Sequence, residues 1–375
     1  MVKTVVSGIL NQERQQILIE DGIITATGQL SKTDLEGATL IETNGELYPG
    51  FIDIHVHGGG GADTMDASPE AFQTIAKTHA AHGTTGLYLT TMTESPERIQ
   101  RVMETLEPTF QSEGAQVLGF HLEGPFINPD YPGAHAQQHI IEPNIELLAE
   151  WIERSRHQVK IITVAPELPG AEALIRFATE QGIVVSMGHS AADLSDAQQG
   201  KAWGAQSVTH LFNAMSRFHH REPGLAGFGL SDEEIYVELI VDYRHVHPFV
   251  VKAMMRAMGE ERLLLITDAM RAACMKDGIY ELGGQMVFVR QGVATLSNGT
   301  IAGSTLTMDQ AVRNLLDAGT LGKQEISRVT SQNQSRLLKL RKGVIAPSFD
   351  GDIIAFDERL QVTHTIVRGN LVFRK

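Results

Sequence analysis

Apolar segments alternate with amphipathic stretches through the middle of the chain. Eight short segments have the apolar character of buried strands, and most of them precede a stretch of helical periodicity. Helix starts are predicted after Ser68 and Ser95, where proline follows, and near Asp193 or Ser195. The predicted strands cover residues 51–57, 84–91, 116–122, 159–165, 183–188, 206–211, 235–241 and 262–267.

This alternation of strands and helices predicts a parallel α/β fold. An open, doubly wound sheet would alternate in the same way. Eight units over about 220 residues match a (β/α)8 barrel better, because that fold needs eight strands, each followed by a helix. We therefore predict a TIM-like barrel over residues 50–342.

The two ends of the chain have a different texture. Residues 1–49 and 343–375 consist of short alternating segments separated by turn signals. Neither end is long enough to bury a core alone, so we expect the two ends to pair into one small β-sandwich domain beside the barrel. The predicted turns are Asp21-Gly22, Asn44-Gly45, Asp350-Gly351 and Arg368-Gly369-Asn370.

Composition narrows the classes of function. The 375 residues are 42% hydrophobic and 20% charged, which is typical of a globular protein, and no apolar run is long enough to span a bilayer. The start of the chain lacks the apolar core of a signal peptide, so we expect a cytoplasmic protein. The single cysteine, Cys274, excludes an intrachain disulfide and a cysteine-rich zinc site.

The balance of charge also selects among ligands. The net charge of −14 argues against nucleic acid, which needs a broad basic surface. A single phosphate group remains possible, because one or two positive side chains with backbone N–H groups suffice to bind it. The run His219-His220-Arg221 is a locally basic loop of that kind.

Histidines and carboxylates follow several of the predicted strands. His55 and His57 are spaced i, i+2 on the first strand, which points both imidazoles to one face. In a barrel, catalytic groups come from the C-terminal ends of the strands, so such residues should converge on one rim. The six candidates are His55, His57, Glu123, His189, His210 and Asp268.

Taken together, these six residues predict a metal site. Singly, each could be a helix cap or a solvated loop group. Their joint placement at strand ends favours a shared function instead. Ligands of this composition suit Zn²⁺, Fe²⁺, Mn²⁺ or Co²⁺ better than Mg²⁺ or Ca²⁺, and their number permits one ion or two.

Longer motifs carry a resemblance to a known family. The histidine pair on strand one, the histidines of strands five and six and the aspartate of strand eight resemble the amidohydrolase superfamily. More narrowly, the chain resembles the N-acetylglucosamine-6-phosphate deacetylase family, and the match runs nearly end to end. The motifs, in chain order, are His-Leu-Glu-Gly-Pro-Phe, Gly-His-Ser, Thr-His-Leu-Phe-Asn-Ala-Met, Arg-Glu-Pro-Gly-Leu-Ala-Gly and Thr-Asp-Ala-Met.

The resemblance implies metal-dependent hydrolysis of the acetamide of a sugar phosphate. It assigns Glu123, His189 and His210 to the principal ion and makes Asp268 the residue that accepts and returns a proton. Members that keep the histidine pair can bind two ions, so His55 and His57 imply a second ion bridged by Glu123. Many relatives in the superfamily instead bridge with a modified lysine at the end of strand four. Here that strand ends without one, because Lys160 lies at its start.

The same resemblance implies the substrate-binding residues. Arg221 matches the family's phosphate-binding arginine, whose planar guanidinium suits a phosphate dianion, although a solvated surface arginine is the alternative. His135 lies in a loop where Asp130-Tyr131-Pro132 replaces the family's usual basic residues, and nearby His247 complicates the match of His245. The full set is Ala134, His135, Asn213, Ala214, Arg221, His245, Ile301, Ala302 and Gly303.

The family also implies a homodimer in which a neighbouring subunit helps to hold the sugar phosphate. Three rival functions remain open: deacetylation of the C4 epimer N-acetylgalactosamine 6-phosphate, hydrolysis of a cyclic amide, and a catalytically silent scaffold. The absent strand-four lysine and the arginine motif weigh against a cyclic amidohydrolase, and the complete ligand set weighs against a scaffold. Residues interpreted as structural are Asp53, His79, His82, His121, Trp151, Trp203 and Cys274.

Overall fold

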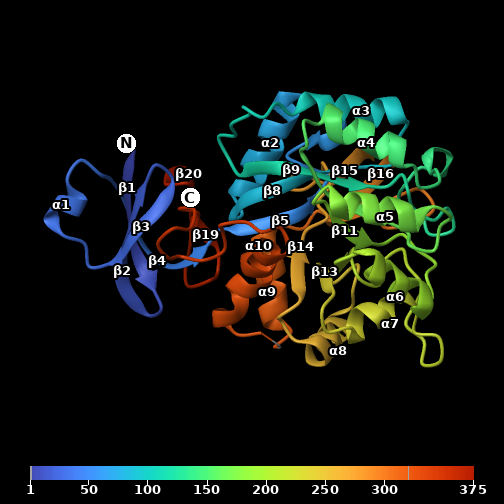
Figure 1. Ribbon diagram of the computed structural model, residues 1–375. Helices are drawn as coiled ribbons and strands as arrows, with labels where there is room; N and C mark the ends of the chain where they lie inside the picture. The colour runs from blue at the N-terminus through green and yellow to red at the C-terminus, as the bar shows by residue number, and fades with distance from the viewer. Residues whose placement is uncertain (1, 320) are drawn as a thin grey trace.

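The computed structural model describes residues 2–319 and 321–375 of the chain. Eight parallel strands form one sheet, and helices surround it (Figure 1). All eight predicted strands are present, with ends shifted by a few residues. They are β5 (Phe51–Val56), β8 (Thr84–Thr91), β9 (Gln116–Glu123), β10 (Val159–Val164), β11 (Val184–Met187), β12 (Ser207–Val208), β13 (Tyr236–Ile240) and β14 (Leu263–Ile266).

Hydrogen bonds beyond the last strand bring the sheet almost to closure. The sheet runs from β5 to β14 in chain order, with only parallel neighbours. The Asp268 N–H donates to the His55 carbonyl over 3.0 Å, and the His57 N–H donates to the Ala269 carbonyl over 2.9 Å. These bonds join the C-terminal ends of the first and eighth strands. The predicted barrel is therefore confirmed. The His55 and His57 pair and Asp268 lie where the barrel closes.

The helices begin where the sequence predicts caps. The side chains of Ser68 and Ser95 accept hydrogen bonds from backbone N–H groups at the starts of the helices that follow them. Asp193, rather than Ser195, caps the helix that begins at Leu194. The helices are α1 (Lys32–Leu35), α2 (Pro69–Ala80), α3 (Pro96–Thr105), α4 (Ile145–Arg154), α5 (Ala171–Glu180), α6 (Leu194–Trp203), α7 (Gly224–Ser231), α8 (Pro248–Met258), α9 (Met308–Asp317) and α10 (Asn333–Leu337).

Both chain ends contribute to one seven-stranded sheet, which confirms that the two ends pair, and this sheet lies at one side of the barrel (Figure 1). It has its own small core, which includes Val6, Ile17 and Ile366. The turns at Asp21-Gly22 and Arg368-Gly369 connect antiparallel strands with positive φ angles. The strands are β1 (Lys3–Leu10), β2 (Glu13–Glu20), β3 (Ile23–Gly28), β4 (Thr39–Pro49), β18 (Ile353–Phe356), β19 (Val362–Val367) and β20 (Asn370–Arg374).

The predicted turn at Asn44-Gly45 is wrong. β4 passes straight through it, and its register against β1 shifts there instead. A side chain on Gly45 would place its Cβ 2.5 Å from the Phe356 carbonyl oxygen. This glycine therefore permits a close approach between strands rather than a reversal of the chain.

A further small sheet, which the sequence pattern did not predict, follows the eighth barrel strand. It consists of β15 (Gly278–Leu282), β16 (Gln285–Arg290) and β17 (Val293–Thr295), all antiparallel. The two short strands β6 (Gly58–Gly59) and β7 (Ala62–Asp63) pair after the first barrel strand. Among the residues that the structure describes, no helix is both long enough and apolar enough to cross a bilayer.

Candidate active site

The six predicted ligands and His135 lie together at the C-terminal rim of the barrel. Glu123 is at the centre, at the end of β9, and is 2% exposed. Its Oε1 lies 3.0 Å from His210 Nε2, 3.2 Å from His189 Nε2 and 3.4 Å from His55 Nε2. Its Oε2 faces the remaining two rings. One carboxylate therefore contacts five imidazoles.

Asp268 completes the cluster from the opposite side. Its Oδ1 lies 3.2 Å from His57 Nε2 and 3.6 Å from His55 Nε2. The other oxygen of Glu123, Oε2, lies 3.1 Å from His57 Nε2 and 3.2 Å from His135 Nε2. The group thus divides into a half with His189 and His210 and a half with His55, His57 and Asp268, and Glu123 contacts both.

The backbone is unusual at three of these residues. His189, His210 and Asp268 have φ angles of 48°, 27° and 51°, in the left-handed region that side chains disfavour. Each lies two residues after the end of a barrel strand, so the chain turns sharply there. Such conformations persist only where surrounding structure holds them, and they cluster at functional sites. Glu167 supplies part of that support, because its carboxylate accepts from Ser190 Oγ over 2.7 Å beside His189.

Burial and charge together set the pKa values of the cluster. Burial alone would raise the pKa of Glu123, but the rings of His55 and His135 hold it well below its ordinary value. Burial likewise opposes ionisation of Asp268, and His55 and His57 still lower its pKa. His57 is desolvated, yet its two carboxylate neighbours raise its pKa to about 9. Both carboxylates are therefore anions at neutral pH.

These residues fit divalent transition metal ions. His55 Nε2 is buried without a hydrogen-bond partner among the described residues, although it faces two carboxylates. Three groups of side chains lie within ligating distance of one another here: His55, His57 and Asp268; Glu123, His135 and His189; and, deeper in the barrel, His55, His121 and Glu238. Imidazole with carboxylate is the donor set of zinc, iron, manganese and cobalt sites.

A cavity of about 270 Å³ opens above the cluster and is lined by most of the predicted substrate residues. Five of the six predicted metal ligands line this cavity: His57, Glu123, His189, His210 and Asp268. Seven of the predicted substrate-binding residues also line it: Ala134, His135, Asn213, Ala214, His245, Ile301 and Gly303. His245 forms a hydrogen bond with Asp242 over 2.7 Å and lines the cavity. The neighbouring His247 instead caps the N-terminus of α8. The cavity is therefore bounded by both metal-type and predicted substrate residues.

Two predicted substrate residues lie outside the cavity wall. Ala302 is fully buried behind it, and its N–H donates to the Ala294 carbonyl. Arg221 is exposed on the loop before α7 and does not line the cavity. Within the single chain described, the arginine predicted to bind phosphate therefore does not line the cavity.

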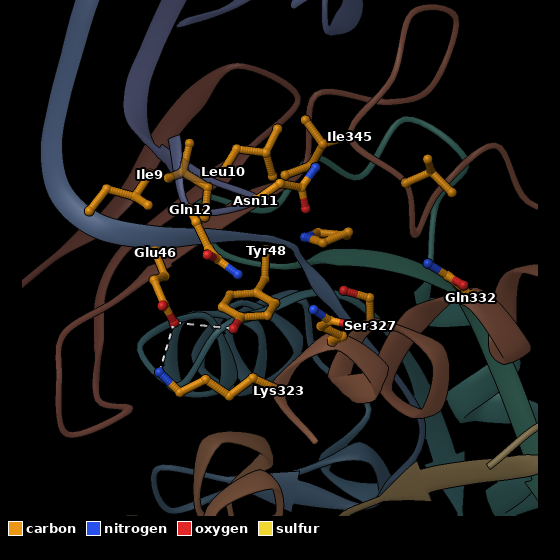
Figure 2. Close-up of a pocket in the computed structure, with 14 residues that line it drawn as sticks. Ile9, Leu10, Asn11, Gln12, Glu46, Tyr48, Lys323, Ser327, Gln332 and Ile345 are labelled. Carbon is orange, nitrogen blue, oxygen red and sulfur yellow. Dashed lines mark hydrogen bonds and ion pairs between the residues drawn. The ribbon is translucent and has the colours of Figure 1, made fainter. Parts of the chain in front are cut away.

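A larger cavity of about 760 Å³ lies between the terminal sheet and the barrel (Figure 2). Its labelled side chains include Tyr48, Glu46 and Lys323, and Glu46 accepts from both of the others. Every group of potential metal ligands found among the described residues includes His55 or Glu123 of the rim cluster instead. Size alone therefore does not identify the active site here, and the convergence of ionisable groups does.

Comparison with known proteins agrees with this geometry. The model of the amidohydrolase family matches residues 47–372. The chain belongs to the amidohydrolase family. It is 40% identical to the N-acetylglucosamine-6-phosphate deacetylase of Lysinibacillus sphaericus, over 98% of this chain and 96% of that protein. It is 36% identical to an N-acetylgalactosamine-6-phosphate deacetylase of Escherichia coli O157:H7, over 95% and 94%.

Solved structures extend the comparison to three dimensions. A mutant N-acetyl-D-glucosamine-6-phosphate deacetylase of Mycobacterium smegmatis, in complex with N-acetyl-D-glucosamine 6-phosphate, superposes with a TM-score of 0.90. It is 30% identical, over 99% of this chain and 100% of that one. The Thermotoga maritima enzyme has a TM-score of 0.87 and 32% identity over 100% and 99%. The resemblance seen in the motifs is thus confirmed along the whole chain.

Sequence reasoning missed several residues of this amidohydrolase site. Glu238, in the middle of β13, bonds His55 Nδ1 over 3.0 Å. The Thr93 N–H donates to His135 Nδ1 over 3.1 Å. When the His135 ring is neutral, its proton therefore lies on Nε2. Leu282, from the small sheet after the barrel, closes one side of the cavity. None belongs to a motif, and Glu238 alone carries a signal, as a lone carboxylate in an apolar strand.

Proposed function

We propose that this protein hydrolyses the acetamide of N-acetyl-D-glucosamine 6-phosphate to D-glucosamine 6-phosphate and acetate, as a step in amino-sugar metabolism. The observation that carries the proposal is one ionised carboxylate, Glu123, ringed by five imidazoles beside Asp268 at the floor of the cavity. Relatives matched over most of their length carry this activity in their names, including the one from Bacillus subtilis at 39% identity. Motif, geometry and kinship point to the same reaction.

Glu123, His189 and His210 would hold the principal ion, and His55, His57 and Asp268 would hold a second. Such an ion makes water a stronger nucleophile at neutral pH and polarises the amide carbonyl. Zinc, iron, manganese and cobalt all suit this donor set, in one or two positions.

Asp268 would move the proton during the reaction. Its carboxylate is ionised, lies at the cavity floor and is 7% exposed, so it can accept a proton from the attacking water. It would then return that proton to the sugar nitrogen as the C–N bond breaks. This second transfer is essential, because an amide nitrogen leaves poorly unless it is protonated.

His135 would act as a neutral hydrogen-bond donor. Burial and neighbouring His189 lower its pKa to about 4, so the ring is uncharged at neutral pH. With Nδ1 accepting from Thr93, its Nε2–H points toward Glu123 and the cavity. A donor held in this way suits the substrate's acetamide oxygen.

The phosphate group would be bound across a homodimer. The cavity lining contains neither lysine nor arginine among the residues described, so a phosphate dianion there lacks a permanent positive partner. Arg221 lies on an exposed loop that also presents Phe218, an aromatic side chain that is 60% exposed. We propose that this loop docks on the neighbouring subunit and that Arg221 reaches that subunit's substrate.

The C4 epimer N-acetylgalactosamine 6-phosphate is the second candidate substrate, because one relative is named for it. The deciding experiment measures acetate release from both epimers, with metal content determined on the same sample. We expect kcat/KM to be higher for the gluco epimer. No release from either epimer with Zn²⁺, Fe²⁺, Mn²⁺ or Co²⁺ would refute the proposed chemistry.

A further inference from the structure

Glu238 is a carboxylate buried in the barrel interior, and among the described residues no lysine or arginine pairs with it. It stands in the middle of β13 and is 0% exposed. Its Oε2 contacts His55 Nδ1 at 3.0 Å and accepts the His210 N–H over 3.3 Å, while its Oε1 has no partner among the described residues. Burying a carboxylate with one oxygen unpaired is unfavourable. The fold therefore gains little stability from it.

The contact with His55 determines how that ring presents its other nitrogen. A carboxylate at Nδ1 accepts the proton there, so Nε2 is the nitrogen that can give its lone pair to a metal ion. Nε2 is the atom that faces Glu123 at 3.4 Å and Asp268 at 3.6 Å. Glu238 thus aims Nε2 of His55 at the space that it shares with the two carboxylates of the cluster, where a cation would be held.

Among the clustered rings described, His55 is the one with a carboxylate behind it. His189 Nδ1 is paired with the Tyr131 carbonyl, and His57 Nδ1 and His210 Nδ1 are without a hydrogen-bond partner. A carboxylate makes the imidazole a stronger ligand than a carbonyl does, because it shares the Nδ1 proton more fully. The reinforced ligand belongs to the half of the cluster with His57 and Asp268.

We propose that Glu238 is a positioning residue for the second metal ion, which it secures by orienting His55 and increasing the basicity of its Nε2. This inference rests on the proposed function, since it concerns how the two-ion site of that enzyme is held. The bond to the His210 N–H also links Glu238 to the backbone of the first ion's ligand. Loss of Glu238 should therefore weaken the second ion strongly and the first ion little.

The test compares Glu238→Gln with wild type in the full-length protein, loaded with Co²⁺ and titrated with a chelator. The glutamine keeps the shape of the side chain and removes its charge. Metal content and the visible spectrum of the bound Co²⁺ are read separately from activity. We expect the affinity for the second ion to fall by about 10- to 100-fold, with the first ion retained.

Asp53→Asn is the matched control. Asp53 is also a fully buried carboxylate on the same strand as His55, but its hydrogen bonds come from Thr267 and from the backbone N–H of His55 rather than from the imidazole ring. This variant should keep both ions. His55→Gln serves as the reference for loss of the second ion, and Glu238→Gln should resemble it in Co²⁺ spectrum.

Two results would overturn the inference: a Glu238→Gln protein that retains two ions with wild-type affinity, or a wild-type protein that binds a single ion. Either result leaves acetate release by the wild type as a separate question. Conversely, wild type without deacetylase activity but with a second ion that depends on Glu238 would refute the proposed function and support the inference. Thermal unfolding of the metal-free variants separates misfolding from loss of the ion.

Discussion

Arg221 offers the sharpest test of how the substrate is held. Arg221→Ala removes a guanidinium that lies outside the cavity of its own subunit, so folding of that subunit should be unaffected. A hydrogen bond to a charged group contributes about 1.5–3 kcal/mol, which corresponds to a rise in KM of about 10- to 150-fold. The unphosphorylated sugar should show little change. Equal effects on both sugars would refute the phosphate contact.

A mixed dimer tests whether the arginine acts on the partner's substrate. At substrate concentrations below the wild-type KM, Arg221→Ala and Asp268→Asn chains are each expected to show little activity alone. In a heterodimer, one site would combine the intact Asp268 of one chain with the intact Arg221 of the other. Co-expression with two affinity tags isolates this species. It should recover about half of the wild-type activity per dimer, because one of its two sites is complete.

The outcome of the mixed dimer is decisive for the sharing of sites. If Arg221 served its own subunit, each site of the heterodimer would lack one essential group, and activity would stay at the level of the separate variants. A Lys201→Gln chain is a suitable control partner, because Lys201 pairs with Asp232 and Glu234 at the surface and does not line the cavity.

Three further predictions address the chemistry and the fold. Asp268→Asn should lower kcat by about 10²- to 10⁴-fold while elemental analysis still finds bound metal; near-normal turnover would exclude its role in proton transfer. Removal of metal by a chelator should abolish acetate release and lower the melting temperature, and adding Zn²⁺ or Co²⁺ should restore both; an unchanged melting temperature would mean that the cluster binds no ion. His82 bonds Asp309 over 3.0 Å, and despite partial burial this contact raises the pKa of His82 from 6.5 to about 10 and lowers that of Asp309 to about 2. A raised pKa gives stability that is complete below pH 6.5 and lost toward pH 10, so the melting-temperature deficit of His82→Gln should shrink over that range, and a constant deficit would contradict it.

Local sequence was sufficient for the strands, the helix caps and most of the cluster. The apolar runs before His55, Glu123 and His210 are short and continuous, and parallel strands place their ends on one rim whatever their order in the chain. Asn44-Gly45 shows where local signals fail. Its composition is that of a turn, but packing against Phe356 requires the absence of a side chain there, and no local pattern records that contact.

The sequence by itself was sufficient to predict the fold class, the candidate metal ligands and the family of this protein, because periodicity and motifs are local properties of the chain. Tertiary structure alone decided which groups those residues face. Glu238 stands in an apolar strand and meets His55, 183 positions away, only because the barrel brings β5 and β13 to the same interior. Arg221 belongs to a motif of the site, yet its loop lies outside the cavity, since the path of a loop depends on long-range packing.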